Sequence, residues 1–104
     1  MRLLDDIARR VDESFSAPDR DRAAALLLRA RVHDGSPADP RLIRCALEAS
    51  RGSLETLQHY VNLLAVDYRE VIMAAEYDSI DGALVRVRDL SQPFGPSNQR
   101  LERP

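Results

Sequence analysis

The 104-residue sequence contains no lysine, no tryptophan, a single cysteine and only five aromatic residues, three Tyr and two Phe. The lone Cys45 excludes an internal disulfide, and it offers no cysteine pair for a metal site. With so few aromatic side chains, any core depends on Leu, Val, Ile and Ala. All 15 basic residues are Arg, a bias that, together with the many Ala residues, indicates GC-rich coding and hence a bacterial source.

Long apolar runs and a strong charge of one sign are also missing. No stretch approaches the roughly 18 apolar residues that a membrane-spanning helix needs. No apolar run near the N-terminus resembles a signal peptide, because Asp5 and Asp6 interrupt it. The net charge of −2 disfavours binding to a phosphate backbone. We therefore expect a cytoplasmic protein that has no membrane partner and does not depend on nucleic acid.

The length and the turn signals predict one helical domain, residues 1–90, and a flexible tail, residues 91–104. A chain this short buries only roughly 60–65% of its unfolded surface, so association with a second chain would add stability. The tail contains three Pro and one Gly among mostly polar residues, which is typical of segments that do not fold. Phe94 is expected to anchor the tail on the body.

The stretch from residue 53 to residue 77 has no Gly or Pro and carries one apolar stripe at alternating spacings of three and four. The members of this stripe are Leu54, Leu57, Val61, Leu64, Tyr68, Val71 and Ala75. Such spacing places side chains on one face of an α-helix. Gly52 suits the left-handed residue that ends the preceding helix, and Ser53 suits the N-cap. The sequence thus predicts a long central helix.

This central stretch also has a second apolar face. At about 100° per residue, Val66 and Met73 point away from the first stripe, with Leu63 nearby. Four residues form the polar strip between the two faces: Glu55, Asn62, Arg69 and Glu76. Either the helix is sandwiched between two others of the same chain, or Leu63, Val66 and Met73 form an exposed patch for a partner.

One local signal competes with a continuous central helix. Asp67, with Glu70 three residues later, has the form of a capping box that would start a new helix at Tyr68. The apolar stripe nevertheless continues across this point. We therefore favour an unbroken helix.

The flanking sequence predicts three further helices before the central one and after it a fourth, at residues 79–90. The earlier three cover residues 2–15, 17–33 and 40–50 and are separated by turn signals, of which Asp39-Pro40 is the strongest start. Residues 85–88 alternate like a strand, but we find no partner strand for them and favour helix. The predicted fold is all-α: a compact bundle of four to five helices with a long central helix.

Known catalytic and metal-binding patterns are missing. Cys45 lies on the predicted buried arc of a helix, where a thiol behaves as a small apolar group. His33 is expected to end a helix, and His59 to be solvated. No spacing of His, Cys or carboxylates matches a metal motif, and no glycine-rich phosphate loop is present. We therefore predict no catalytic residue, no metal and no cofactor.

A helix, a Gly-containing turn and a second helix is also the layout of a DNA-binding motif. Here the second helix is long and acidic, so the pattern disfavours that function. The one basic surface is the predicted second helix, which carries Arg20, Arg22, Arg29 and Arg31.

The function hypothesis is a non-enzymatic helical interaction module that self-associates or binds a protein partner. Its predicted interface residues are Leu63, Val66 and Met73, with Tyr60 or Arg69 at the rim. One alternative is a small enzyme or ligand-binding domain with a pocket near Tyr60, Tyr68, Arg69 and Glu70. A weaker alternative is a nucleic-acid accessory protein that uses the Arg-rich second helix.

Overall fold

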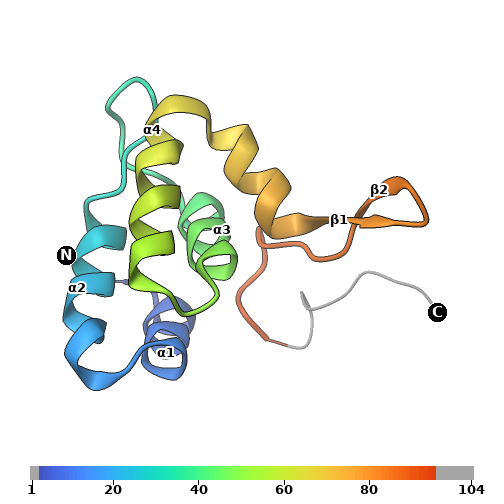
Figure 1. Ribbon diagram of the computed structural model, residues 1–104. Helices are drawn as coiled ribbons and strands as arrows, with labels where there is room; N and C mark the ends of the chain where they lie inside the picture. The colour runs from blue at the N-terminus through green and yellow to red at the C-terminus, as the bar shows by residue number, and fades with distance from the viewer. Residues whose placement is uncertain (1–2, 96–104) are drawn as a thin grey trace.

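A computed structural model of the chain describes residues 3–95, which form four α-helices and one two-stranded antiparallel sheet (Figure 1). The helices are α1 (Asp5–Ser14), α2 (Ala17–Leu28), α3 (Pro40–Ser50) and α4 (Leu54–Glu76). The strands are β1 (Tyr77–Ile80) and β2 (Ala83–Arg86). Most of the predicted flexible tail, residues 96–104, lies outside the described residues.

The chain is mostly helical, as predicted, but the prediction of an all-α fold is wrong in the C-terminal part. Residues 79–90 do not form a helix; β1 and β2 pair as a hairpin, with Tyr77 opposite Arg86 and Ile80 opposite Ala83. The loop is Asp81-Gly82, and both residues have positive φ, 52° and 81°. This is the two-residue turn that joins antiparallel strands best, because its twist matches theirs. The partner strand that the sequence analysis did not find for residues 85–88 is β1, which directly follows α4.

The helix starts that the sequence marked are confirmed. Asp39 Oδ1 accepts a hydrogen bond from the backbone N–H of Leu42 at 3.0 Å, directly ahead of Pro40 at the start of α3. Ser53 Oγ accepts one from the backbone N–H of Thr56 at 3.2 Å. Each side chain satisfies a donor that has no partner within its own helix.

α2 is shorter than predicted, because it ends at Leu28 and not at His33. The chain then turns back on itself: Arg31 pairs with Pro37 in an isolated antiparallel bridge, and Ala38 N–H donates to Ala30 O at 3.0 Å. Gly35, with φ of 86°, is the left-handed residue of this turn. His33 is exposed in the loop and ends no helix.

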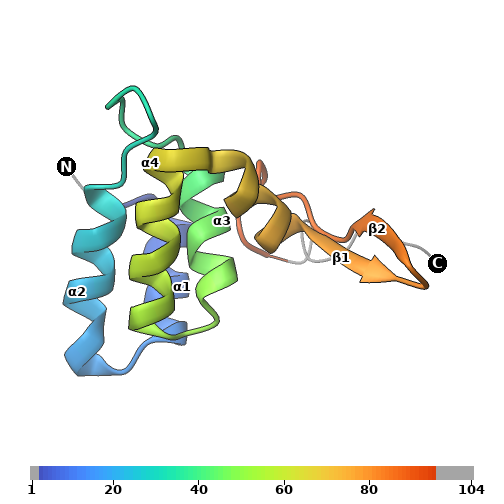
Figure 2. The ribbon, with the colours of Figure 1, turned by 45° about the horizontal axis from the view of Figure 1, so that its top comes forward.

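The core lies among α1, α2, α3 and the first part of α4, which stand side by side in Figure 2. Leu57 and Leu64 are buried as the central stripe predicted, and Cys45 is buried as its arc predicted. The other helices contribute buried apolar side chains, among them Ile7, Val11, Ala23, Leu27 and Ala46. α4 packs against both α3 and α2, so it is the central helix. The hairpin packs mainly on itself and projects from this body.

The segment after β2 returns to the helices. Leu90 is only 1% exposed, and Phe94 packs against the core as expected. The guanidinium of Arg10 lies 4.5 Å from the centre of the Phe94 ring, a distance at which a cation and an aromatic face attract. This return path fixes the polar clusters described next.

Candidate functional site

α4 is interrupted at Asp67, whose backbone lies outside the helical region (φ −155°, ψ 92°). Asp67 Oδ1 accepts a hydrogen bond from the backbone N–H of Arg69 at 3.1 Å, as an N-cap does. α4 therefore consists of an N-terminal half, residues 54–66, and a C-terminal half, residues 68–76, which differ in direction (Figure 1). The prediction of an unbroken helix is wrong, because the capping signal outweighed the continuity of the apolar stripe.

Beyond the break, the predicted apolar stripe continues in the core at Val71, but Tyr68 of the same stripe is 38% exposed. Val71 and Glu76 are each 0% exposed, whereas Val66 is 76% and Met73 39% exposed. The predicted polar strip is therefore wrong at Glu76, which was expected to face solvent. Glu76 is buried because α3 and the segment after β2 cover its carboxylate.

The five predicted interface residues do not share one exposed face. Val66, Arg69 and Met73 are exposed, while Tyr60 and Leu63 are half-buried and pack against the core. The three exposed residues lie at and beyond the break at Asp67. The surface available to a partner is thus shifted towards the C-terminal half of α4.

Exposed large apolar residues are concentrated in one part of the described chain. They are Leu4, Val66, Tyr68, Met73, Ile80, Leu84 and Val85, of which six fall within residues 66–85. We call residues 66–85 the distal segment; it holds the C-terminal half of α4 and most of the hairpin. Scattered exposed apolar residues are ordinary in proteins, but their concentration in one segment marks a candidate contact surface.

The hairpin contributes to this surface with both its faces. The pairing register places Ile80, Ala83 and Val85 on one face and Leu84 on the other. All four side chains are exposed. An isolated two-stranded hairpin is marginal in water, so apolar side chains on both faces would gain from being covered.

The buried Glu76 carboxylate joins α3, α4 and the segment after β2. Arg41 donates to it from Nε at 3.0 Å and from Nη2 at 2.8 Å. Arg86 Nε donates at 3.0 Å, and the backbone N–H of Leu90 at 3.1 Å. The carboxylate is thereby paired and hydrogen-bonded, which a buried charge requires.

This environment determines the protonation of the two buried groups that meet there. Burial raises the pKa of Glu76, but the hydrogen bonds from Arg41 and Leu90 outweigh it and hold the pKa below its ordinary value. Burial, and then the Glu76 charge, raise the pKa of the Cys45 thiol well above its ordinary value. Cys45 Sγ lies 3.7 Å from Glu76 Oε2 as a neutral donor. A buried neutral thiol is a poor nucleophile.

A second buried ion pair ties α1 to α3. Arg44 donates to Asp6 from Nε at 2.9 Å and from Nη2 at 3.3 Å, and to Leu90 O at 3.2 Å. The backbone N–H of Phe94 donates to Asp6 Oδ2 at 3.0 Å. Burial raises the pKa of Asp6, but the bonds from Arg44 and Phe94 leave it lower than usual. Both ion pairs thus hold the segment after β2 against the helices.

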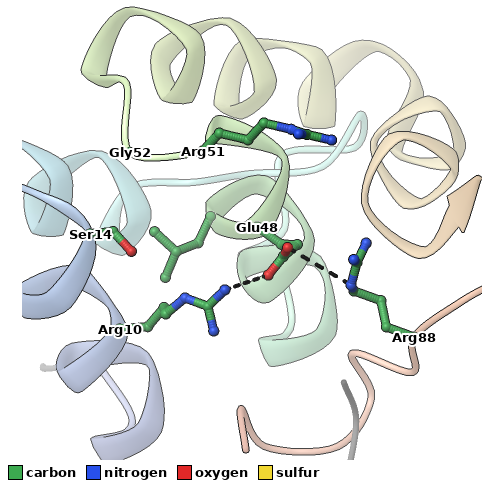
Figure 3. Close-up of a pocket in the computed structure, with 7 residues that line it drawn as sticks. Arg10, Ser14, Glu48, Arg51, Gly52 and Arg88 are labelled. Carbon is green, nitrogen blue, oxygen red and sulfur yellow. Dashed lines mark hydrogen bonds and ion pairs between the residues drawn. The ribbon is translucent and has the colours of Figure 1, made fainter. Parts of the chain in front are cut away.

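An open cavity of about 260 Å³ lies where α1, the α3–α4 turn and the segment after β2 meet (Figure 3). We call it the basic pocket; it is lined by Arg10, Ser14, Leu47, Glu48, Arg51, Gly52 and Arg88. In Figure 3, Arg10 and Arg88 approach Glu48 from opposite sides, and Arg51 extends above them. Three guanidinium groups face one carboxylate, which leaves a formal charge of +2. No sequence pattern predicted this cluster.

The α3–α4 turn forms one wall of the basic pocket and is backbone-strained. Arg51 adopts the left-handed conformation (φ 51°, ψ 38°), which is uncommon for a residue with a side chain. Gly52 has φ of 78°, and a Cβ on it would lie 2.8 Å from Ser14 O. Only glycine therefore lets the turn approach the end of α1 so closely.

The three arginines of the basic pocket differ in how they are held. Arg10 Nη2 donates to Glu48 Oε1 at 2.7 Å. Arg88 Nη1 donates to Ala75 O at 2.6 Å, with its Nε 3.8 Å from Glu48 Oε2. Within residues 3–95, the Arg51 side chain forms no hydrogen bond or ion pair. The basic pocket thus holds two positioned guanidinium groups and one that is free.

Two other cavities are described, and neither is lined by Tyr60, Tyr68, Arg69 or Glu70. One of about 610 Å³ opens between α2 and α4 and has Leu26, Leu54 and Gln58 among its lining residues. The other, of about 160 Å³, lies between the start of α1 and the α2–α3 loop. The four residues of the alternative pocket hypothesis lie around the break at Asp67, and only Tyr60 is half-buried.

The remaining chemistry of residues 3–95 is sparse. These residues contain no group of three or more His, Cys, Asp or Glu side chains that could hold a metal ion. None of their helices is long and apolar enough to cross a membrane. Arg29 and Arg31 lie beyond the end of α2, so the predicted basic row of four is not continuous along that helix. His59 is exposed beside Tyr60, at 5.0 Å between ring centres.

Comparison of the chain with protein-family models, with curated proteins and with solved structures finds no significant match in any of the three. The function is therefore argued from the surfaces and side chains described above.

Proposed function

We propose that this protein is a non-enzymatic interaction module that self-associates through the distal segment, residues 66–85. The observation that supports the proposal is the concentration of exposed large apolar side chains there, six of the seven in the described chain. Burying them against a second copy would remove apolar area from water at about 25 cal/mol per Å².

A second copy is the occupant that the hairpin fits best. Among residues 3–95, no strand pairs with the outer edge of β2 along Ala83–Arg86, and such an edge can add a strand from another chain. In a symmetric antiparallel pairing of two β2 strands centred on Leu84, Leu84 would lie opposite Leu84 of the other copy, and Ala83 opposite its Val85. These apolar residues meet without a charge between them. Twofold pairing of one surface with itself is the commonest route to a homodimer.

The interface residues predicted from the sequence enter this proposal in part. Val66, Met73 and Arg69 lie on the distal segment and are retained as contact residues. Tyr60 and Leu63 pack against the body, so they would support the surface and not form its centre.

Light scattering coupled to size-exclusion chromatography tests self-association. Val66→Glu and Leu84→Glu place a charge on side chains that are 76% and 59% exposed, so the fold should tolerate both. We expect a dimer for the unmodified protein, and monomers for both variants. Leu4→Glu is the matched control, because Leu4 is 48% exposed but lies on the body; it should remain dimeric. An unmodified protein that is monomeric at every concentration would contradict the proposal.

A further inference from the structure

We propose that the basic pocket binds a phosphoryl group, the tetrahedral divalent oxyanion that its charge and donors suit. The pocket lies outside the distal segment, so this inference is independent of self-association. It assigns a ligand class to Arg10, Arg51 and Arg88, which the interaction surface does not use.

Charge is the first argument. Three guanidinium groups and one carboxylate give the basic pocket a formal charge of +2, which a divalent anion would neutralise. Glu48 holds Arg10 through its hydrogen bond at 2.7 Å and has Arg88 3.8 Å away. These two side chains are therefore partly ordered before any ligand arrives, and an anion would not have to organise them.

The free guanidinium of Arg51 is the second argument. Arginine presents planar paired donors that match two oxygens of a phosphoryl group. Arg10 and Arg88 already have carboxylate or carbonyl partners, while Arg51 has none within residues 3–95. An incoming anion could therefore take both donors of Arg51 without breaking a bond inside the protein.

The conformation of Arg51 is the third argument. A left-handed backbone costs roughly 1 kcal/mol for a residue with a Cβ, and Gly or Asn adopts it more readily. Stability alone would therefore favour Gly or Asn over Arg at position 51. Such strain is found more often at binding sites than elsewhere, and here it carries the free guanidinium over the pocket.

Size limits the ligand. A cavity of about 260 Å³ lies just below the range of roughly 300–1,000 Å³ typical of sites for drug-sized molecules. It suits phosphate or a small phosphate monoester, with any larger part of the ligand remaining in solvent.

Titration calorimetry with inorganic phosphate, at constant ionic strength, tests the proposal. Sulfate, with the same shape and charge, should bind similarly, and acetate should bind about ten-fold more weakly. O-phosphoserine shows whether the ligand of the pocket is free phosphate or a phosphate monoester. If it binds more tightly than inorganic phosphate, the pocket recognises a monoester; if it binds equally, the pocket recognises the phosphoryl group alone. Absence of heat with phosphate, sulfate and O-phosphoserine would overturn the proposal.

Arg51→Asn is the decisive variant, because it removes the guanidinium and fits the left-handed backbone. We expect a loss of affinity of about ten-fold or more, the value of a charge-assisted hydrogen bond, with no loss of thermal stability. Arg9→Gln, which removes an exposed charge on α1, should change the affinity by less than about two-fold. Equal weakening by both variants would mean that only overall charge attracts phosphate, and would also overturn the assignment.

Discussion

The helical body, residues 3–65, and the distal segment, residues 66–85, use the same apolar residue types in opposite ways. The body buries its Leu, Ile and Val in one core and leaves Leu4 as its only exposed large apolar side chain among the described residues. The distal segment buries Val71 but exposes six large apolar side chains. The difference indicates that the body is complete by itself, whereas the distal segment has more apolar surface than this chain covers.

The two regions share one core, to which the distal segment contributes Val71 and Ala75, and charged groups link them further. Glu76, at the end of α4, accepts hydrogen bonds from Arg41 on one side and from Arg86 on the other. The backbone N–H of Val87 donates to Glu76 O at 2.7 Å. The orientation of the hairpin therefore depends on one buried carboxylate, and the predictions below begin with it.

Glu76→Gln should have the largest effect on stability. It leaves Arg41 and Arg86 without their shared carboxylate, and breaking a buried pair costs about 3 kcal/mol or more. Glu70→Gln is the matched control, since Glu70 is exposed on the same half of α4, and should change the free energy of unfolding by less than about 0.5 kcal/mol. Urea unfolding measures the free energy of unfolding of both variants. Equally small losses would show that Glu76 is not the link between the regions.

Val71→Ala and Val66→Ala compare the two sides of the break directly. Val71 is 0% exposed, so its truncation should cost about 2 kcal/mol through lost burial and the cavity left behind. Val66 is 76% exposed and should cost less than about 0.5 kcal/mol in the monomer. Denaturant unfolding at low protein concentration separates them. The reverse order would mean that Val66, and not Val71, packs in the core.

Comparing Gly52→Ala with Gly35→Ala separates the cost of a close contact with α1 from the cost of backbone strain alone. Both glycines have positive φ, 78° and 86°, so alanine is strained by about 1 kcal/mol at either position. At Gly52 the new Cβ would also meet Ser14 O at 2.8 Å, whereas at Gly35 it meets nothing within 4 Å. We expect Gly52→Ala to lose roughly 1 kcal/mol more, measured as a lower melting temperature. Equal losses would show that α1 does not restrict the turn.

Acid should weaken the protein through Glu76 and Asp6. The pKa of each group is lower in the folded protein than its ordinary value, 4.5 for Glu76 and 3.8 for Asp6. Their stabilising contribution is therefore present above those ordinary values and is lost as pH falls through and below them. Urea unfolding between about pH 6 and pH 3 should show this decline. In Glu76→Gln the free energy of unfolding should fall less steeply with decreasing pH. An unchanged dependence on pH would contradict the role of Glu76.

Local signals in the sequence were sufficient for most of the helical body. Asp39, Ser53 and Gly52 each act within a few residues of their own position, through a cap or a turn, and each was predicted correctly. The apolar stripes gave the core for the same reason, because their spacing reflects a single helix.

The errors came where two signals competed or where distant residues decide. At Asp67 the cap outweighed the apolar stripe. Glu76 was placed in the polar strip, but contacts with α3 and with the segment after β2 bury it. The Asp81-Gly82 pair is a hairpin signal that was overlooked, because the residues on both sides of it were assigned to a helix at residues 79–90. The partners of Glu76 lie 35 and 10 residues away, and the basic pocket collects arginines from three separate segments, so no local pattern reveals either.

Hydrogen exchange of the β2 backbone amides, measured as a function of protein concentration, tests most directly whether a second copy covers the distal segment. We predict that protection within Ala83–Arg86 rises with concentration, while protection within α3 stays constant. Exchange in β2 that is fast and independent of concentration would contradict the account, since the edge strand would then remain open to water.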